Sequence, residues 1–163
     1  MNEDSSSQRI KLIENNVAAL LAVWKDFEGV TFVDNQTKTQ IVTGFHLAYM
    51  NSVTNANFSG DIIEHIRTTL IPFSEKKVPV LWWIGPNSKP IDLDIHLEKF
   101  GFKKIDEPPG MYINLNDLDL NYQYPPELKV EVIKEVKQVE DFTTVFVAGM
   151  GGTEERRKEL LKS

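Results

Sequence analysis

The chain contains no cysteine, which excludes disulfide bonds, thiolate metal sites, iron–sulfur clusters and a cysteine nucleophile. It also has no uninterrupted apolar run near the roughly 18 residues that a membrane-spanning helix needs. Basic side chains are the minority, with 18 Lys and Arg against 24 Asp and Glu, and the net charge of −6 disfavours a nucleic acid or a membrane as partner. Residues 1–8 have neither the basic nor the apolar region of a secretory signal, so we expect a disordered lead-in and a cytoplasmic location.

The remaining composition is that of a globular protein: 163 residues, 41% hydrophobic and 26% charged, are enough to bury one core. Apolar residues at spacings of three and four predict an amphipathic helix over 9–28. Runs of β-branched and aromatic residues predict strands near 39–45 and 50–58. A second helix is expected from Ile62, and the preceding Asp61 is placed to cap it together with a glutamate in its first turn.

Residues 78–84, VPVLWWI, contain no polar side chain. They therefore predict a strand that is covered on both faces, at the centre of the sheet. A third helix is predicted over 90–100, followed by short strands at 102–106 and 111–115. Strands and helices in this order predict an α/β (α+β) fold with helices around a mixed sheet.

A polar segment at 117–127, closed by two prolines, predicts a linker. Beyond it, alternating apolar residues from Leu128 predict a half-buried strand, and 136–150 predicts a helix before a charged tail helix. One strand and two short helices cannot bury a core of their own. We therefore expect 128–163 to dock on the first unit, to meet another chain, or to begin a second domain.

At Leu97-Glu98-Lys99-Phe100-Gly101-Phe102, followed by Met111-Tyr112-Ile113-Asn114-Leu115, the sequence resembles the GNAT superfamily of acyl-CoA-dependent N-acetyltransferases. In that family a helix ends in Tyr-Glu-Lys-x-Gly-Phe before a strand pair. The wider run over 79–102 looks like the N-terminal half of tandem proteins in which a degenerate domain precedes the catalytic one. The resemblance implies a GNAT-like, mostly antiparallel central sheet over 9–116 and the start of a second, incomplete GNAT-like domain over 128–163.

Two features on which the family's chemistry depends are missing. Family members bind the diphosphate of CoA with an Arg/Gln-x-x-Gly-x-Gly/Ala loop at a helix N-terminus, where backbone N–H groups point outward. The equivalent junction here, 57–61, has a single glycine, and the negative charge of Asp61 would repel phosphate. Leu97 stands where the family often places the tyrosine that protonates the departing thiolate. The resemblance thus implies acetyl transfer from acetyl-CoA to an amine by the parent protein, with this chain a non-catalytic portion that binds no acetyl-CoA.

The alternative function is a module without catalysis, for binding a small ligand or for dimerisation. The partner expected for 128–163 is a second GNAT domain or a second copy of the chain, and a small-molecule amine stays open as a ligand. We expect no metal site, because the three histidines have no ligand spacing with an acidic partner.

Three candidates for a substrate cleft follow from residue chemistry. His46 lies at a predicted strand end, where it could act as a general base, and a structural role is the alternative. Trp82 and Trp83 are adjacent on one predicted strand and therefore point to opposite faces. One of them could line a cleft where parallel strands separate, whereas packing of both in the core is the simpler interpretation.

Three further candidates come from the resemblance alone. Tyr49, Asn51 and Asn55 lie on the strand that in active relatives offers backbone groups to the acyl-CoA arm. As an alternative, the two asparagines could cap turns or bond at a bulge.

Overall fold

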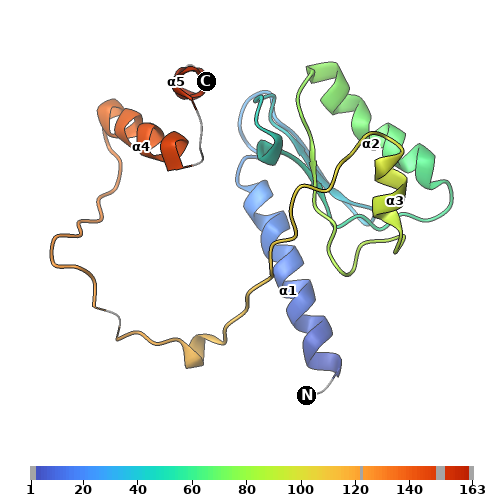
Figure 1. Cartoon of the computed structure of the whole chain (residues 1–163), viewed down its shortest axis with the longest axis horizontal. Helices are drawn as coiled ribbons and strands as arrows, with labels where there is room; N and C mark the ends of the chain where they lie inside the picture. The colour runs from blue at the N-terminus through green and yellow to red at the C-terminus, as the bar shows by residue number, and fades with distance from the viewer. Residues whose placement is uncertain (1–2, 122, 150–152, 162–163) are drawn as a thin grey trace. The chain divides into compact units, whose positions relative to one another are not determined.

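A computed structural model describes residues 3–121, 123–149 and 153–161 (Figure 1). The chain divides into two compact units, Met1–Asp117 and Leu118–Ser163, at the start of the segment predicted as a linker. Within the described parts, no helix combines the length and the apolar content needed to cross a bilayer.

A four-stranded mixed sheet forms the centre of the first unit, with the strand order β1-β2-β3-β4. Strands β1, β2 and β3 are antiparallel neighbours, whereas β4 runs parallel to β3 with Val53 opposite Trp82. A parallel neighbour requires a crossover connection, which α2 supplies between β3 and β4. The predicted mixed α/β class is confirmed. The strands are β1 (Thr31–Asp34), β2 (Thr39–Val42), β3 (Asn51–Thr54) and β4 (Leu81–Trp82).

Helices cover both faces of this sheet. Val42 and Val53 pack with Ile66 of α2 and Leu93 of α3 in one cluster of buried residues. Because side chains alternate along a strand, Ile41 points to the opposite face, and α1 packs against β2 and β3 there (Figure 1). The helical elements of this unit are α1 (Glu3–Ala22), α2 (Ile62–Lys76) and α3 (Leu93–Glu98), with 3-10 turns η1 (Ala48–Met50) and η2 (Leu115–Asp117).

The structure corrects the expectation of a disordered lead-in over 1–8, because α1 begins at Glu3. Residues 1–2 lie outside the described part. Each residue added to an existing helix gains one hydrogen bond, so an added turn costs far less conformational free energy than the nucleation of a new helix. At its other end α1 stops at Ala22, and Val23 and Trp24 continue it only as turns.

The position expected for 78–84 is also corrected, because β4 is an edge strand in the described sheet. The strands predicted at 102–106 and 111–115 do not form. Two prolines between these segments, Pro108 and Pro109, have no backbone N–H to donate, which disfavours a hairpin at this place. Without a hairpin there, β4 lacks the neighbour that would have made it central.

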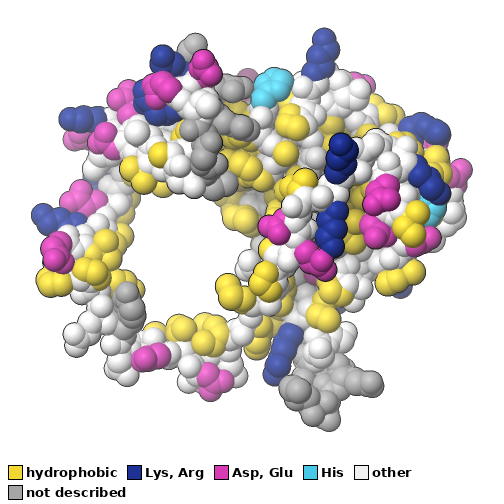
Figure 2. Space-filling view, in the orientation of Figure 1, with side chains coloured by type: hydrophobic (Ala, Val, Ile, Leu, Met, Phe, Trp, Pro, Cys, Tyr) yellow, Lys and Arg dark blue, Asp and Glu magenta, His cyan; other side chains and the backbone are white. Residues whose placement is uncertain are grey.

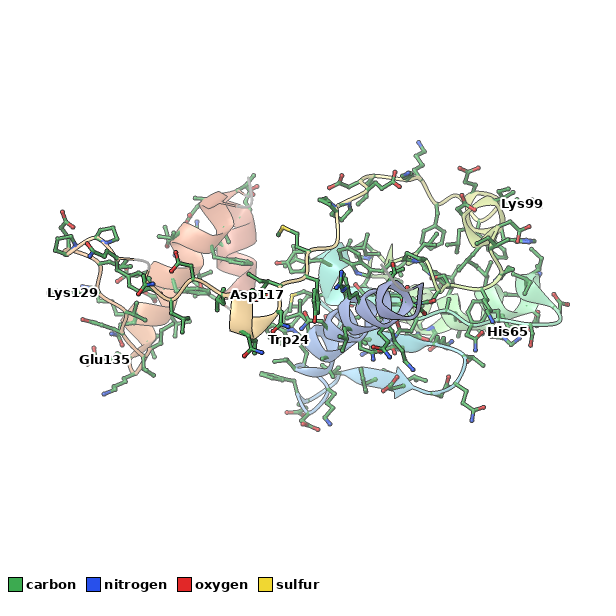
Figure 3. All side chains as sticks on the ribbon, turned by 90° about the horizontal axis from the view of Figure 1, so that it is seen from below. Trp24, His65, Lys99, Asp117, Lys129 and Glu135 are labelled. Atoms are coloured by element: carbon green, nitrogen blue, oxygen red, sulfur yellow. The ribbon has the colours of Figure 1, made fainter. Side chains whose placement is uncertain are left out.

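The second unit contains α4 (Val136–Gly149) and α5 (Glu154–Leu160). The strand predicted from Leu128 does not form, and the chain between Lys129 and Glu135 runs without pairing (Figure 3). Hydrophobic side chains are visible on the surface of the extended segment that leads to α4 (Figure 2). An unpaired strand is not stable in water by itself, so the alternating pattern alone could not produce one.

The β1–β2 hairpin is joined to α2 by polar side chains around Thr69. The Lys38 ammonium donates to Thr69 Oγ1 at 2.6 Å, and Gln40 Nε2 donates to the Thr69 carbonyl at 3.1 Å. Partial burial lowers the pKa of Lys38 because the charged amine loses part of its hydration.

Replacement of Ile66 by alanine should lower the free energy of unfolding by about 2–5 kcal/mol, because its side chain is fully buried where α2 packs on the sheet. The matched control is Ile71→Ala in the same helix, where the isoleucine is 48% exposed. We expect a change below about 1 kcal/mol in the control. Urea denaturation followed by circular dichroism measures both, and equal losses would contradict the placement of the core.

Stability should rise with pH in the alkaline range relative to the variant Lys38→Met. The folded state lowers the pKa of Lys38, so below the ordinary lysine pKa of about 10.4 the unfolded chain binds more protons than the folded one. Raising the pH deprotonates Lys38 and therefore removes the free-energy penalty of burying a charged amine, which only the wild type has. Thermal melts of both proteins between neutral pH and about pH 10 measure the difference. A constant difference would show that the amine is fully hydrated.

Candidate functional site

The junction that would hold a diphosphate is already occupied by the chain's own carboxylate. Asp61 Oδ1 accepts a hydrogen bond from the Glu64 N–H at 3.0 Å and caps α2. Glu64 does not complete a reciprocal cap, because its side chain pairs with Arg67 instead. Gly60 has a φ of +79°, which the tight turn into the helix requires. The start of α2 thus carries two carboxylates and one capped N–H group.

The side of β3 that faces β4 is also occupied by the chain itself. The Trp83 N–H donates to the Val53 carbonyl at 2.8 Å. Further along, the Lys89 N–H donates to the Ala56 carbonyl at 2.8 Å, and the Phe58 N–H donates to the Lys89 carbonyl at 3.0 Å. The two chain segments separate after β4 and meet again at Lys89. Between these points, directly after the last residue of β3, Asn55 has a φ of +54°.

Leu97 lies where the family's tyrosine would stand, and its side chain is 3% exposed. It belongs to the same apolar cluster as Phe58 and Trp82. A hydroxyl group at this position would enter the core, because the leucine does not face an open cleft.

His46 and Tyr49 lie on the connection between β2 and β3, Tyr49 within η1. His46 is exposed, and Tyr49 is 37% exposed. Neither residue lines the groove described below, so the structure does not bring them together with Asn55.

Asn51 organises that connection from within the protein, where it is fully buried. Its Oδ1 accepts from the N–H groups of Thr43 and Gly44, at 3.0 and 3.3 Å. Its Nδ2 donates to the carbonyls of Phe45 and Leu47. The side chain therefore acts as a turn cap rather than as a lining residue of a cleft.

Trp82 lies in the core, edge-on to Phe58 and Phe102 at centroid distances of 6.1 and 5.9 Å. Its indole Nε1 is buried without a hydrogen-bond partner among the described residues. Trp83 is half-buried, and it too is absent from the groove lining. Of the six predicted cleft residues, only Asn55 lies on the groove.

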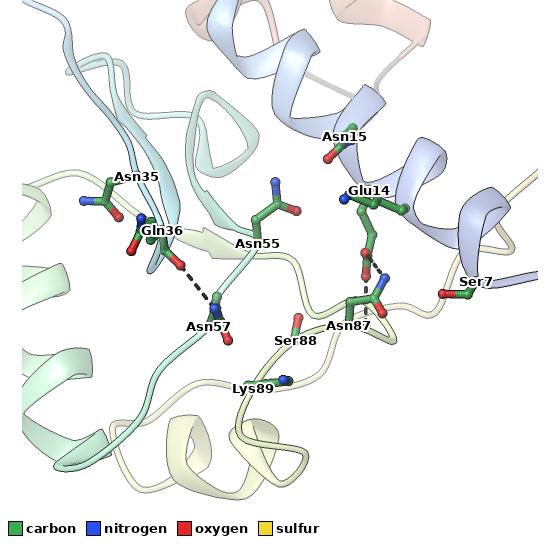
Figure 4. A pocket seen from close by; sticks show the side chains of 12 residues that line it. Ser7, Glu14, Asn15, Asn35, Gln36, Asn55, Asn57, Asn87, Ser88 and Lys89 are labelled. Atoms are coloured by element: carbon green, nitrogen blue, oxygen red, sulfur yellow. Dashed lines mark hydrogen bonds between the residues drawn. The ribbon is translucent and has the colours of Figure 1, made fainter. Parts of the chain in front are cut away.

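An open groove of about 650 Å³ lies where α1 passes the ends of β3 and β4 (Figure 4). Its walls come from α1, the β1–β2 turn, the segment after β3 and the loop after β4. All but one of its lining side chains are polar, and two are lysines. The lining residues are Ser7, Lys11, Glu14, Asn15, Asn35, Gln36, Asn55, Ala56, Asn57, Asn87, Ser88 and Lys89.

Two contacts hold the groove walls together (Figure 4). The Glu14 carboxylate accepts from the Asn87 N–H at 3.0 Å and from Asn87 Nδ2 at 2.6 Å, which ties α1 to the loop after β4. On the other side, Asn57 Nδ2 donates to the Gln36 carbonyl at 3.2 Å. Gly85 leaves room for the first contact, because a Cβ at this position would lie 2.2 Å from Glu14 Oε1.

Sequence reasoning missed most of this groove. Of the residues from α1, Ser7 falls in the segment expected to be disordered, and Lys11, Glu14 and Asn15 fall in the predicted helix without a predicted ligand role. Two signals point to them. Ser7, Lys11 and Glu14 recur at spacings of four and three on one helix side. Asn55 and Asn87 follow two strands whose carboxyl ends meet at one edge of the sheet, because β3 and β4 are parallel.

A search of residues 3–121, 123–149 and 153–161 finds no group of three His, Asp or Glu side chains that could hold a metal ion. Comparison of the chain with family models, with curated proteins and with solved structures finds no match.

The variant Asn51→Ala should lose about 2–3 kcal/mol of unfolding free energy, because it leaves buried backbone groups of the β2–β3 connection without partners. Asn57→Ala is the matched control, since this exposed asparagine donates a single side-chain hydrogen bond. Its loss should stay below about 1 kcal/mol. Chemical denaturation measures both variants, and a similar loss in each would refute the role given to Asn51.

Proposed function

We propose that residues 9–116 form a GNAT-like domain that has lost acyl-CoA chemistry, and that this chain is the non-catalytic N-terminal portion of a GNAT-type N-acetyltransferase. The motif at 97–102 and the order of strands and helices before it support the family assignment. The parallel β3–β4 pair, joined through α2, supports it further.

The observation that carries the loss of chemistry is the hydrogen bonding of β3 and of the segment 55–58 that follows it. An acyl-CoA arm would need backbone groups along this stretch. The carbonyls of Val53 and Ala56 already accept bonds from the chain after them, and the Phe58 N–H already donates one. A ligand arm would have to displace Lys89, and the loss of those buried bonds would cost more than a typical net hydrogen bond supplies.

The start of α2 supports the same conclusion by electrostatics. A helix N-terminus favours an anion through its exposed N–H groups and its dipole. Here the Asp61 carboxylate uses this position, and Glu64 adds a second negative charge one turn away. A diphosphate would meet two like charges, which removes the advantage of the site.

In this proposal the acetyl transfer from acetyl-CoA to an amine belongs to the parent protein, and 128–163 opens its second GNAT-like domain. The apolar side chains that α4 leaves exposed are consistent with a segment that packs on another protein surface, in that domain or in a second copy. They include Val139, Phe142, Val145 and Phe146.

Calorimetric titration of the 163-residue chain with CoA and with acetyl-CoA tests the proposal. We expect a Kd above about 1 mM for both, because neither the strand edge nor the helix terminus is available. The variant Asp61→Ser keeps a helix cap while it removes the charge, and it should not gain binding because β3 stays paired.

Micromolar binding by the wild type, or transfer of acetyl groups to an amine, would contradict the proposal. Binding that appears only in Asp61→Ser would show that charge alone blocks the site, and the argument from β3 would then be wrong.

A further inference from the structure

We infer that the groove between α1 and the ends of β3 and β4 binds a small molecule that carries one anionic group and several hydroxyl groups. This inference does not rest on the proposed family, because it uses only the lining of the groove. Its volume of about 650 Å³ lies within the range of about 300–1,000 Å³ that is usual for small-molecule sites.

The charges in the groove favour an anion. Lys11 and Lys89 both line it, and neither side-chain ammonium group has a hydrogen-bond or ion-pair partner among the described residues. The one carboxylate, Glu14, already uses both oxygens in its contacts with Asn87. With two lysines and one carboxylate, the groove lining carries a net positive charge in a chain whose net charge is −6. A cationic amine would be repelled here, whereas a carboxylate or a phosphate would be attracted.

The carboxamides of the lining suit a hydroxylated ligand. An amide side chain offers both a donor and an acceptor, as a hydroxyl group does. Asn55, Asn57 and Asn87 donate through Nδ2 to the protein, which leaves each Oδ1 without a bonded donor in the described structure. Asn15 and Gln36 have no side-chain partner there. Several amide groups thus line the same groove as the two lysines.

The walls are held in place before any ligand arrives. Glu14 joins α1 to the loop after β4, and the Asn57 N–H donates to the Thr37 carbonyl at 2.8 Å. The loop is closed again at Lys89 by its backbone bonds with Ala56 and Phe58. A site with walls fixed in this way loses little entropy when it binds.

Isothermal calorimetry of the full chain at low salt tests the inference with three probes: glucose 6-phosphate, gluconate and glucose. We expect at least one of the two anions to bind, and glucose to bind about tenfold more weakly because it lacks the charge. Lys11→Gln and Lys89→Gln should each weaken the binding of the anion by about tenfold. Lys25→Gln removes an exposed lysine outside the groove and should leave the affinity unchanged.

Binding of only one of the anions supports the inference and identifies the anionic group as phosphate or carboxylate. The absence of heat from both anions at about 10 mM would overturn it, since an affinity weaker than that is below about 3 kcal/mol. Equal affinity for glucose would overturn the role of charge. Unchanged affinity in both groove variants, or an equal loss in Lys25→Gln, would show that any binding occurs elsewhere.

Discussion

Strand β3 is hydrogen-bonded along both of its edges, and the rest of the first unit depends on this arrangement. On one side it pairs with β2 in antiparallel register, and on the other it bonds to β4. Ala56 and Phe58, in the segment that follows β3, bond to Lys89. All four residues of β3 are buried. A buried strand must satisfy every backbone group, so the elements on either side cannot move away without leaving unpaired donors and acceptors.

The side chains of β3 have different surroundings on the two faces of the sheet. Val53 points toward α2 and α3 into an apolar cluster, whereas Ser52 and Thr54 point toward the side that α1 covers. Thr39, on the same side as Thr54, donates to Asp34 and so keeps its hydroxyl group satisfied. The side covered by α1 also buries Ile41, and it ends in the amide-lined groove. The groove and the crossover through α2 therefore both adjoin this strand.

Much of the fold was predictable because its signals are local. The cap by Asp61 and the start of α2 follow from residues within one helical turn, and β2 and β3 follow from β-branched residues that are neighbours along each strand. The candidate site was predicted poorly. Only Asn55 was named correctly as a lining residue, and Asn51 holds a turn together. The groove is assembled from four separate segments, and no one of them shows that the other three lie beside it.

The sequence by itself determined the secondary structure of the central part, the mixed α/β class and the negative charge at the start of α2, because each depends on nearby residues. Only the tertiary structure decided that β4 lies at an edge, that residues 3–8 continue α1, and that Lys11 and Lys89 share one groove. These features depend on contacts between residues far apart in the chain. The residues next to a strand or a lysine in the sequence do not specify which distant residues will lie beside it, since strand pairing and charge clustering arise only when the segments pack.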